Sequence, residues 1–126
     1  MKSRESLTRL RSFQVREKSR QVAQIETMVA EFTRMGEELD GQIAYEEKKT
    51  GIDDPSHFAY STFAKAARAR RENLTASVAD LNDQLEAAQG ALAEAEAELA
   101  KAERKEERDR SGAEEQFDAQ RHAMIG

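Results

Sequence analysis

The sequence has 126 residues, of which 36% are charged and only 6% aromatic, with a formal net charge of -5. A globular domain of this length needs more large apolar side chains, whereas paired long helices need only a narrow apolar stripe. The absence of cysteine excludes disulfide bonds, thiolate zinc sites and a cysteine nucleophile. No stretch reaches the roughly 20 apolar residues of a membrane span and the basic start lacks a signal-peptide core, so we expect a soluble, cytoplasmic protein without membrane insertion.

The first half of the chain predicts one long helix over residues 3–49. Two apolar series, each of seven-residue spacing and offset by three positions, run along it: Val15, Val22, Val29, Gly36 and Ile43, and Ile25, Phe32 and Leu39. Such alternating steps of three and four form the seam of a coiled coil. Glycine at position 36 fills this seam poorly, and Arg11, Lys18 and Glu46 interrupt it.

A helix stop and a helix start follow one another within residues 50–55. Gly51 is the expected left-handed residue just beyond a helix end. Asp54 is a candidate N-cap, with Pro55 at the first helical position. So short a turn between two long helices favours an antiparallel hairpin, in which residue i lies opposite roughly residue 106 minus i.

The second predicted helix covers residues 56–110, with Ser61 or Thr62 as an alternative N-cap after a short helical turn. Its seam keeps the four-and-three rhythm without a break over Leu74, Val78, Leu81, Leu85, Ala88, Leu92, Ala95, Leu99 and Ala102, and extending it backwards reaches Ala67, Ala64 and Tyr60. Residues 111–126 lose the seam, and we expect them to be a frayed or helical tail. The fold class is therefore predicted to be all-α, a single antiparallel coiled-coil hairpin over residues 1–126.

Catalytic and metal-binding constellations are weak in this sequence. Asp54, Ser56 and His57 are the residue types of a hydrolytic triad, but they are nearly adjacent at a turn, where capping accounts for them. Asp53, Asp54 and His57 form at best a weak metal chelate. There is no phosphate-binding glycine loop. We therefore predict no enzymatic activity, no metal and no cofactor.

Several aromatic side chains lie at the turn, although the formation of a turn does not require them. Phe58, Tyr60 and Phe63 have two interpretations. They cap the end of the hairpin core against Ile43, Tyr45 and Ile52, or at least one of them is an exposed anchor for a partner protein. Exposed aromatic residues beside arginines are typical of interface hot spots.

A basic cluster, KAARARR (65–71), follows the aromatic residues. Its charged members are a solvated helix face, a docking patch for an acidic protein, or a nucleic-acid contact: Lys65, Arg68, Arg70 and Arg71. The acidic stretches on either side and the negative net charge argue against nucleic acid as a partner.

The N-terminal arm is also basic and includes Arg9, Arg11 and Arg16. One interpretation is internal, with the bases of this arm (Arg4, Arg9, Arg11, Arg16, Lys18 and Arg20) paired to acids of the second helix such as Glu94, Glu96 and Glu98. The other is functional, with a positive end that enters an acidic or ring-shaped partner. The sequence leaves both open.

The order of these features resembles the FliJ family of flagellar type III export proteins, particularly its alphaproteobacterial members. The basic start, SRESLTRLRSFQVREKSRQVAQIE (3–26), and the centre, GIDDPSHFAYSTFAKAARARRENL (51–74), carry the resemblance, which covers most of the chain. The central segment is its specific part, since coiled coils in general resemble one another in composition.

The resemblance implies a two-helix antiparallel coiled coil, similar to the stalk of the rotary ATPase γ subunit. It implies a cytoplasmic protein, peripheral to the inner membrane at the flagellar base, that binds the export ATPase hexamer and bridges it to the cytoplasmic domain of the export gate. Export chaperones are further implied partners, and motility depends on such proteins. No catalytic residue belongs to the family. The competing hypothesis is a structural coiled-coil homodimer or scaffold.

Overall fold

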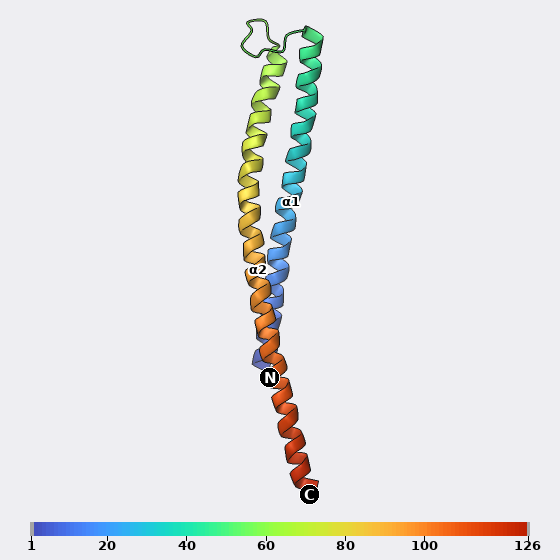
Figure 1. The fold of residues 1–126 in the computed structure, drawn as a ribbon, viewed down its shortest axis with the longest axis vertical. Coiled ribbons are helices and arrows are strands. Elements are labelled where there is room, and N and C mark those ends of the chain that lie inside the picture. Colours follow the sequence, from blue (N-terminus) through green and yellow to red (C-terminus); the bar gives the residue numbers. More distant parts are fainter. Residues whose placement is uncertain (1, 126) are drawn as a thin grey trace. The chain divides into compact units, whose positions relative to one another are not determined.

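The computed structural model describes residues 2–125, which form two helices and the loop between them (Figure 1). Helix α1 spans Lys2–Thr50 with 49 residues, and helix α2 spans Thr62–Ile125 with 64 residues. The described residues contain no strand. The fold is all-α, with the two helices packed against each other, and this arrangement is compatible with the predicted antiparallel hairpin.

The chain divides into two compact units. One unit is Ala23–Ala87, and the other combines Met1–Val22 with Ala88–Gly126. The first unit contains the loop and buries Ile43, Tyr60, Ala64, Ala67 and Leu81, while the second buries Val22 and Ala102. Every one of these buried side chains lies at a predicted seam position, so the apolar periodicity identified the face on which each helix packs.

The end of α1 follows the expected capping chemistry. Gly51 has a φ of 76°, a left-handed conformation that glycine adopts without steric cost. Its N–H donates to the carbonyl oxygen of Glu47 at 2.8 Å, which satisfies one acceptor of the last helical turn. Lys48 and Lys49 lie in that turn, where positive charge opposes the negative end of the helix dipole.

The start of α2 differs from the prediction, because the residues after Pro55 form turns and not a helix. Asp54 accepts hydrogen bonds from the backbone N–H and the hydroxyl of Ser56, at 2.9 and 2.7 Å. The His57 imidazole Nδ1 then accepts the Ala59 N–H at 3.0 Å. That side-chain bond takes an amide that a continuing helix would need for its own backbone, so the helix does not propagate from Pro55.

Ser61 provides the N-cap of α2, the alternative start considered from the sequence. Its hydroxyl oxygen accepts the N–H of Ala64 at 3.2 Å, and α2 begins at Thr62. The same hydroxyl donates to Glu46 Oε1 of α1 at 3.0 Å. One side chain therefore caps the second helix and ties its start to the first.

At its far end α2 continues past residue 110 to Ile125, so the tail is helical, one of the two alternatives considered from the sequence. Gly112 lies inside it without ending it. One internal glycine costs only about 1 kcal/mol, and the neighbouring alanines, glutamates and glutamines favour helix. Residues 111–124 are exposed, so the tail is helical without being buried. Residue 126 of the predicted tail lies outside the described residues.

Within the described residues, neither helix contains an apolar segment that is long and hydrophobic enough to cross a membrane.

Candidate partner-binding surfaces

Tyr60 lies at the junction of the loop and the two helices. The residue is only 8% exposed, and its hydroxyl donates to Glu47 Oε2 at 2.8 Å. Arg68 donates from Nε to the Tyr60 hydroxyl at 2.8 Å and from Nη2 to Glu47 Oε2 at 2.9 Å. Its guanidinium carbon lies 5.9 Å from the centre of the Tyr60 ring. These two predicted partner-binding residues are therefore engaged in linking α1 to α2.

The Glu47 carboxylate is stabilised in its charged form by this network. The hydrogen bond from Arg68 and then the one from Tyr60 lower the pKa of Glu47 below its ordinary value of 4.5. The bonds to Tyr60 and Glu47 raise the pKa of Arg68 above its ordinary value. The pair therefore stays ionised wherever the protein is folded at neutral pH.

Phe58 is the most exposed of the large apolar residues, at 96%. Its ring stacks on the His57 imidazole, with centroids 4.8 Å apart and planes inclined by 21°. His57 is in turn held by its bond to the Ala59 N–H. The loop thus presents a large apolar side chain that stacks on a ring held by a hydrogen bond.

Arg71 is committed to a contact with α1. Its Nε donates to Asp40 Oδ1 at 2.9 Å. The guanidinium lies directly over Gly36, and a Cβ built on that glycine would collide with it. Gly36, which seemed a defect of the seam, therefore provides the space through which Arg71 reaches across to Asp40.

Phe63 and Arg70 have a different position, because both are exposed on α2. Phe63 is 56% exposed, while the next residue, Ala64, is fully buried. The first interpretation, a cap on the core, therefore does not hold for Phe63, because the small Ala64 of the predicted seam takes the core position and allows close helix approach. Arg70 makes no ion pair within the part of the chain that the structure describes.

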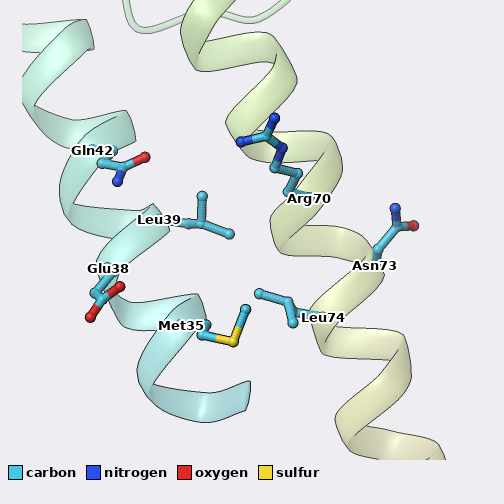
Figure 2. Close-up of a pocket in the computed structure, with 7 residues that line it drawn as sticks. All are labelled: Met35, Glu38, Leu39, Gln42, Arg70, Asn73 and Leu74. Atoms are coloured by element: carbon cyan, nitrogen blue, oxygen red, sulfur yellow. The ribbon is translucent and has the colours of Figure 1, made fainter. Parts of the chain in front are cut away.

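A shallow groove of about 350 Å³ lies between the helices in the Ala23–Ala87 unit. Figure 2 shows Met35 and Leu39 pointing from α1 towards Leu74 of α2. Polar side chains complete the lining of this groove: Glu38, Gln42, Arg70 and Asn73. The sequence analysis missed this surface, although the seven-residue spacing of Met28, Met35 and Gln42 beside the seam was a signal for it.

The basic residues near the start of α1 are only partly engaged. Arg4 donates from Nε to Asp109 Oδ2 at 2.9 Å, an ion pair between the helices of the second unit. Arg11 donates to the neighbouring Gln14 at 3.1 Å. Arg9 and Arg16 are exposed, and no ion pair is found for either of them within residues 2–125.

Internal pairing of this arm with the second helix, one of the two interpretations, is observed within the described residues only for Arg4, which pairs with Asp109 and not with a glutamate among residues 94–98. Arg11 and Lys18 line one surface hollow together with Glu94 and Glu98, but no ion pair joins them among the described residues. The one ion pair between helices at this end lies farther along α2, at Asp109. The positive charge of Arg9 and Arg16 thus remains available to solvent.

The residues considered for metal binding and catalysis lie in the loop, where Asp54 and His57 accept hydrogen bonds from neighbouring residues. Within the described residues, no group of three or more His, Asp or Glu side chains has the arrangement to hold a metal ion. Asp54 is engaged with Ser56, whose side-chain and then backbone hydrogen bonds lower the pKa of that carboxyl. Ser56, Asp54 and His57 therefore organise the loop.

Comparison with known proteins gives no further assignment: no family model, no curated protein and no solved structure matches this chain.

Proposed function

We propose that this chain is an accessory stalk protein of the flagellar type III export apparatus, with the form of an antiparallel coiled-coil hairpin. In this role it is a non-enzymatic cytoplasmic protein, peripheral to the inner membrane at the flagellar base. It binds the export ATPase hexamer and bridges it to the cytoplasmic domain of the export gate, with export chaperones as further partners. The proposal rests on the resemblance to the FliJ family.

The observation that best supports a bridging role is the chemical difference between the two units. The Ala23–Ala87 unit presents Phe58 on a short loop, with its ring almost wholly exposed. The other unit presents Arg9 and Arg16 without an ion pair among the described residues. An apolar anchor and an unpaired basic surface suit two different partners, because the first favours tight local packing and the second long-range attraction.

We assign the basic N-terminal arm to the ATPase ring and the loop to the export gate. The arm includes Arg9, Arg11 and Arg16, and of the loop-side residues Phe58 is the free anchor. Tyr60, Arg68 and Arg71 support the loop side through their contacts with Glu47 and Asp40. Positive charge at the arm raises the rate of association with an acidic surface, and salt weakens this effect.

The test is a pair of variants measured against both partners. Arg9→Glu with Arg16→Glu is expected to weaken binding to the purified export ATPase and its stimulation, with a smaller dependence on salt than the parent. Phe58→Ala is expected to leave ATPase stimulation unchanged and to weaken binding to the cytoplasmic domain of the gate. If neither the parent nor the variants stimulate the export ATPase, the proposed role is refuted. A stable dimer in light scattering would instead favour the structural homodimer.

A further inference from the structure

The two flanks of the helix pair in the Ala23–Ala87 unit differ in chemistry. On one flank, Asp40 and Glu47 of α1, seven residues apart, bond to Arg71 and Arg68 of α2. These ion pairs bridge the two helices along that flank, which we call the closed flank; the other is the open flank. On the other side of the seam, Met35 and Gln42 occupy the corresponding positions, and the structure records no ion pair between the helices there over residues 23–87.

The open flank carries exposed apolar side chains on both helices, interspersed with polar ones. Met28 and Met35 are each 42% exposed, and they lie seven residues apart on one face of α1. Phe63 is 56% exposed on α2, and Arg70 follows it after the same interval. Leu39 and Leu74 form the floor of the groove between these two rows (Figure 2). The surface is thus an elongated strip and not an enclosed cavity.

Charge on this strip is unbalanced. Glu38 already accepts a hydrogen bond from Arg34 of its own helix at 2.9 Å. Arg70 lines the groove and lacks an ion pair among the described residues, while its neighbours Arg68 and Arg71 each have one. An acidic side chain supplied from outside the chain would complement Arg70.

We propose that this open flank binds one amphipathic helix of a partner protein, whose apolar stripe lies along the groove and whose acidic side chain pairs with Arg70. A groove between two helices accepts the apolar face of a third helix, in which contacts recur at three- and four-residue steps. Met28 and Met35 suit such a contact because the unbranched thioether side chain adapts its shape to the partner. The flank is separate from the loop tip and from the N-terminal arm, so the proposal does not depend on the proposed function.

The experiment uses the full chain and two fluorescent peptides of about 21 residues, each with leucine at its a and d positions. One peptide carries glutamate at the positions that flank the stripe, and the other carries lysine. Fluorescence anisotropy at physiological salt measures both affinities. The acidic peptide is expected to bind more tightly, although the net charge of the chain is -5 and non-specific attraction would favour the basic peptide.

Charge reversal tests the contact with Arg70. Arg70→Glu is expected to weaken binding of the acidic peptide by about tenfold and to strengthen binding of the basic one. The matched control is Lys65→Glu, the same change of charge at an exposed position outside the groove, which is expected to leave both affinities unchanged. Met35→Gln should weaken both peptides, and Met124→Gln, at a position 88% exposed on the other unit, should not.

Two controls complete the design. Because Arg70 and Met35 are exposed, their variants should melt at the temperature of the parent, which separates lost binding from lost folding. Failure of both peptides to bind would overturn the proposal, as would equal effects of Arg70→Glu and Lys65→Glu. Self-association of the parent in sedimentation equilibrium, abolished by Met35→Gln, would identify a second copy of the chain as the occupant and also overturn it.

Discussion

Gly36→Ala is expected to stabilise the protein less than Gly41→Ala, although both glycines lie inside α1. Replacing an internal helical glycine with alanine normally adds about 1 kcal/mol, because the unfolded chain loses conformational freedom. Open space surrounds the position of a new Cβ at Gly41, so Gly41→Ala should show this full gain. At Gly36 the new methyl group would collide with the Arg71 guanidinium.

The cost at Gly36 is limited by the nature of the obstacle. The colliding atoms are the end of a flexible side chain, so Arg71 can move aside at the expense of its 2.9 Å ion pair with Asp40. The two side chains are 34% and 55% exposed, and a pair of this kind contributes about 0.2–1 kcal/mol. The net effect of Gly36→Ala should therefore be about 0–0.8 kcal/mol of stabilisation.

Chemical denaturation of four variants tests this reasoning: Gly36→Ala, Gly41→Ala, Arg71→Ala, and Gly36→Ala combined with Arg71→Ala. With Arg71 truncated, Gly36→Ala should regain the full stabilisation of about 1 kcal/mol seen at Gly41. Equal stabilisation by Gly36→Ala and Gly41→Ala in the parent background would refute the close approach of Arg71 to Gly36.

The remaining predictions concern the seam, the Glu47 network and the loop. Leu81→Ala should destabilise the protein by about 2–3 kcal/mol, which is the lower end of the range for a buried leucine. Leu85→Ala should destabilise it less, because Leu85 is less buried. If both variants melt at the temperature of the parent, the seam is misplaced. Because the folded state lowers the pKa of Glu47, the stability from this group is present above about pH 4.5 and is lost as the pH falls through the folded pKa. Glu47→Gln should therefore lower the melting temperature at pH 7, and its difference from the parent should shrink as the pH falls below 4.5; a difference that does not change with pH would exclude an ionic origin. Phe58→Ala should leave the melting temperature unchanged, since its ring is 96% exposed, and early melting would show that Phe58 belongs to the core.

Periodicity in the sequence was sufficient to predict the helices and the side on which they pack. Val22, Ile43, Leu81 and Ala102 were all chosen by seven-residue spacing, and all are buried. This succeeds because the helical repeat determines which side chains share a face, whatever the partner is. The same logic predicted the left-handed conformation of Gly51, where the lack of a Cβ decides the outcome.

The start of α2 could not be read from local signals. Asp54 followed by Pro55 is compatible with both a helix start and a tight turn. Both can begin with an aspartate side chain that accepts a backbone N–H, followed by a proline whose ring fixes φ. The choice depends on the bond between the His57 ring and the Ala59 N–H, which is a matter of side-chain conformation. Hydrophobicity alone left the exposure of Phe63 open, whereas the seam rhythm had already selected the neighbouring Ala64, which is buried.

The basic cluster after the loop illustrates why charge composition is a poor guide to binding residues. Arg68, Arg70 and Arg71 lie within four positions of one another in the sequence. Because an α-helix turns by about 100° per residue, their side chains nevertheless lie on both flanks of the seam. Arg68 and Arg71 meet Glu47 and Asp40, and such contacts fix the register between helices more than they add stability. Arg70 lines the groove with Met35, Gln42 and Glu38 of α1, and the one carboxylate among them, Glu38, is already bonded to Arg34. Since Arg68 and Arg71 are also paired within the chain, an acidic side chain of the proposed partner helix would gain most from Arg70.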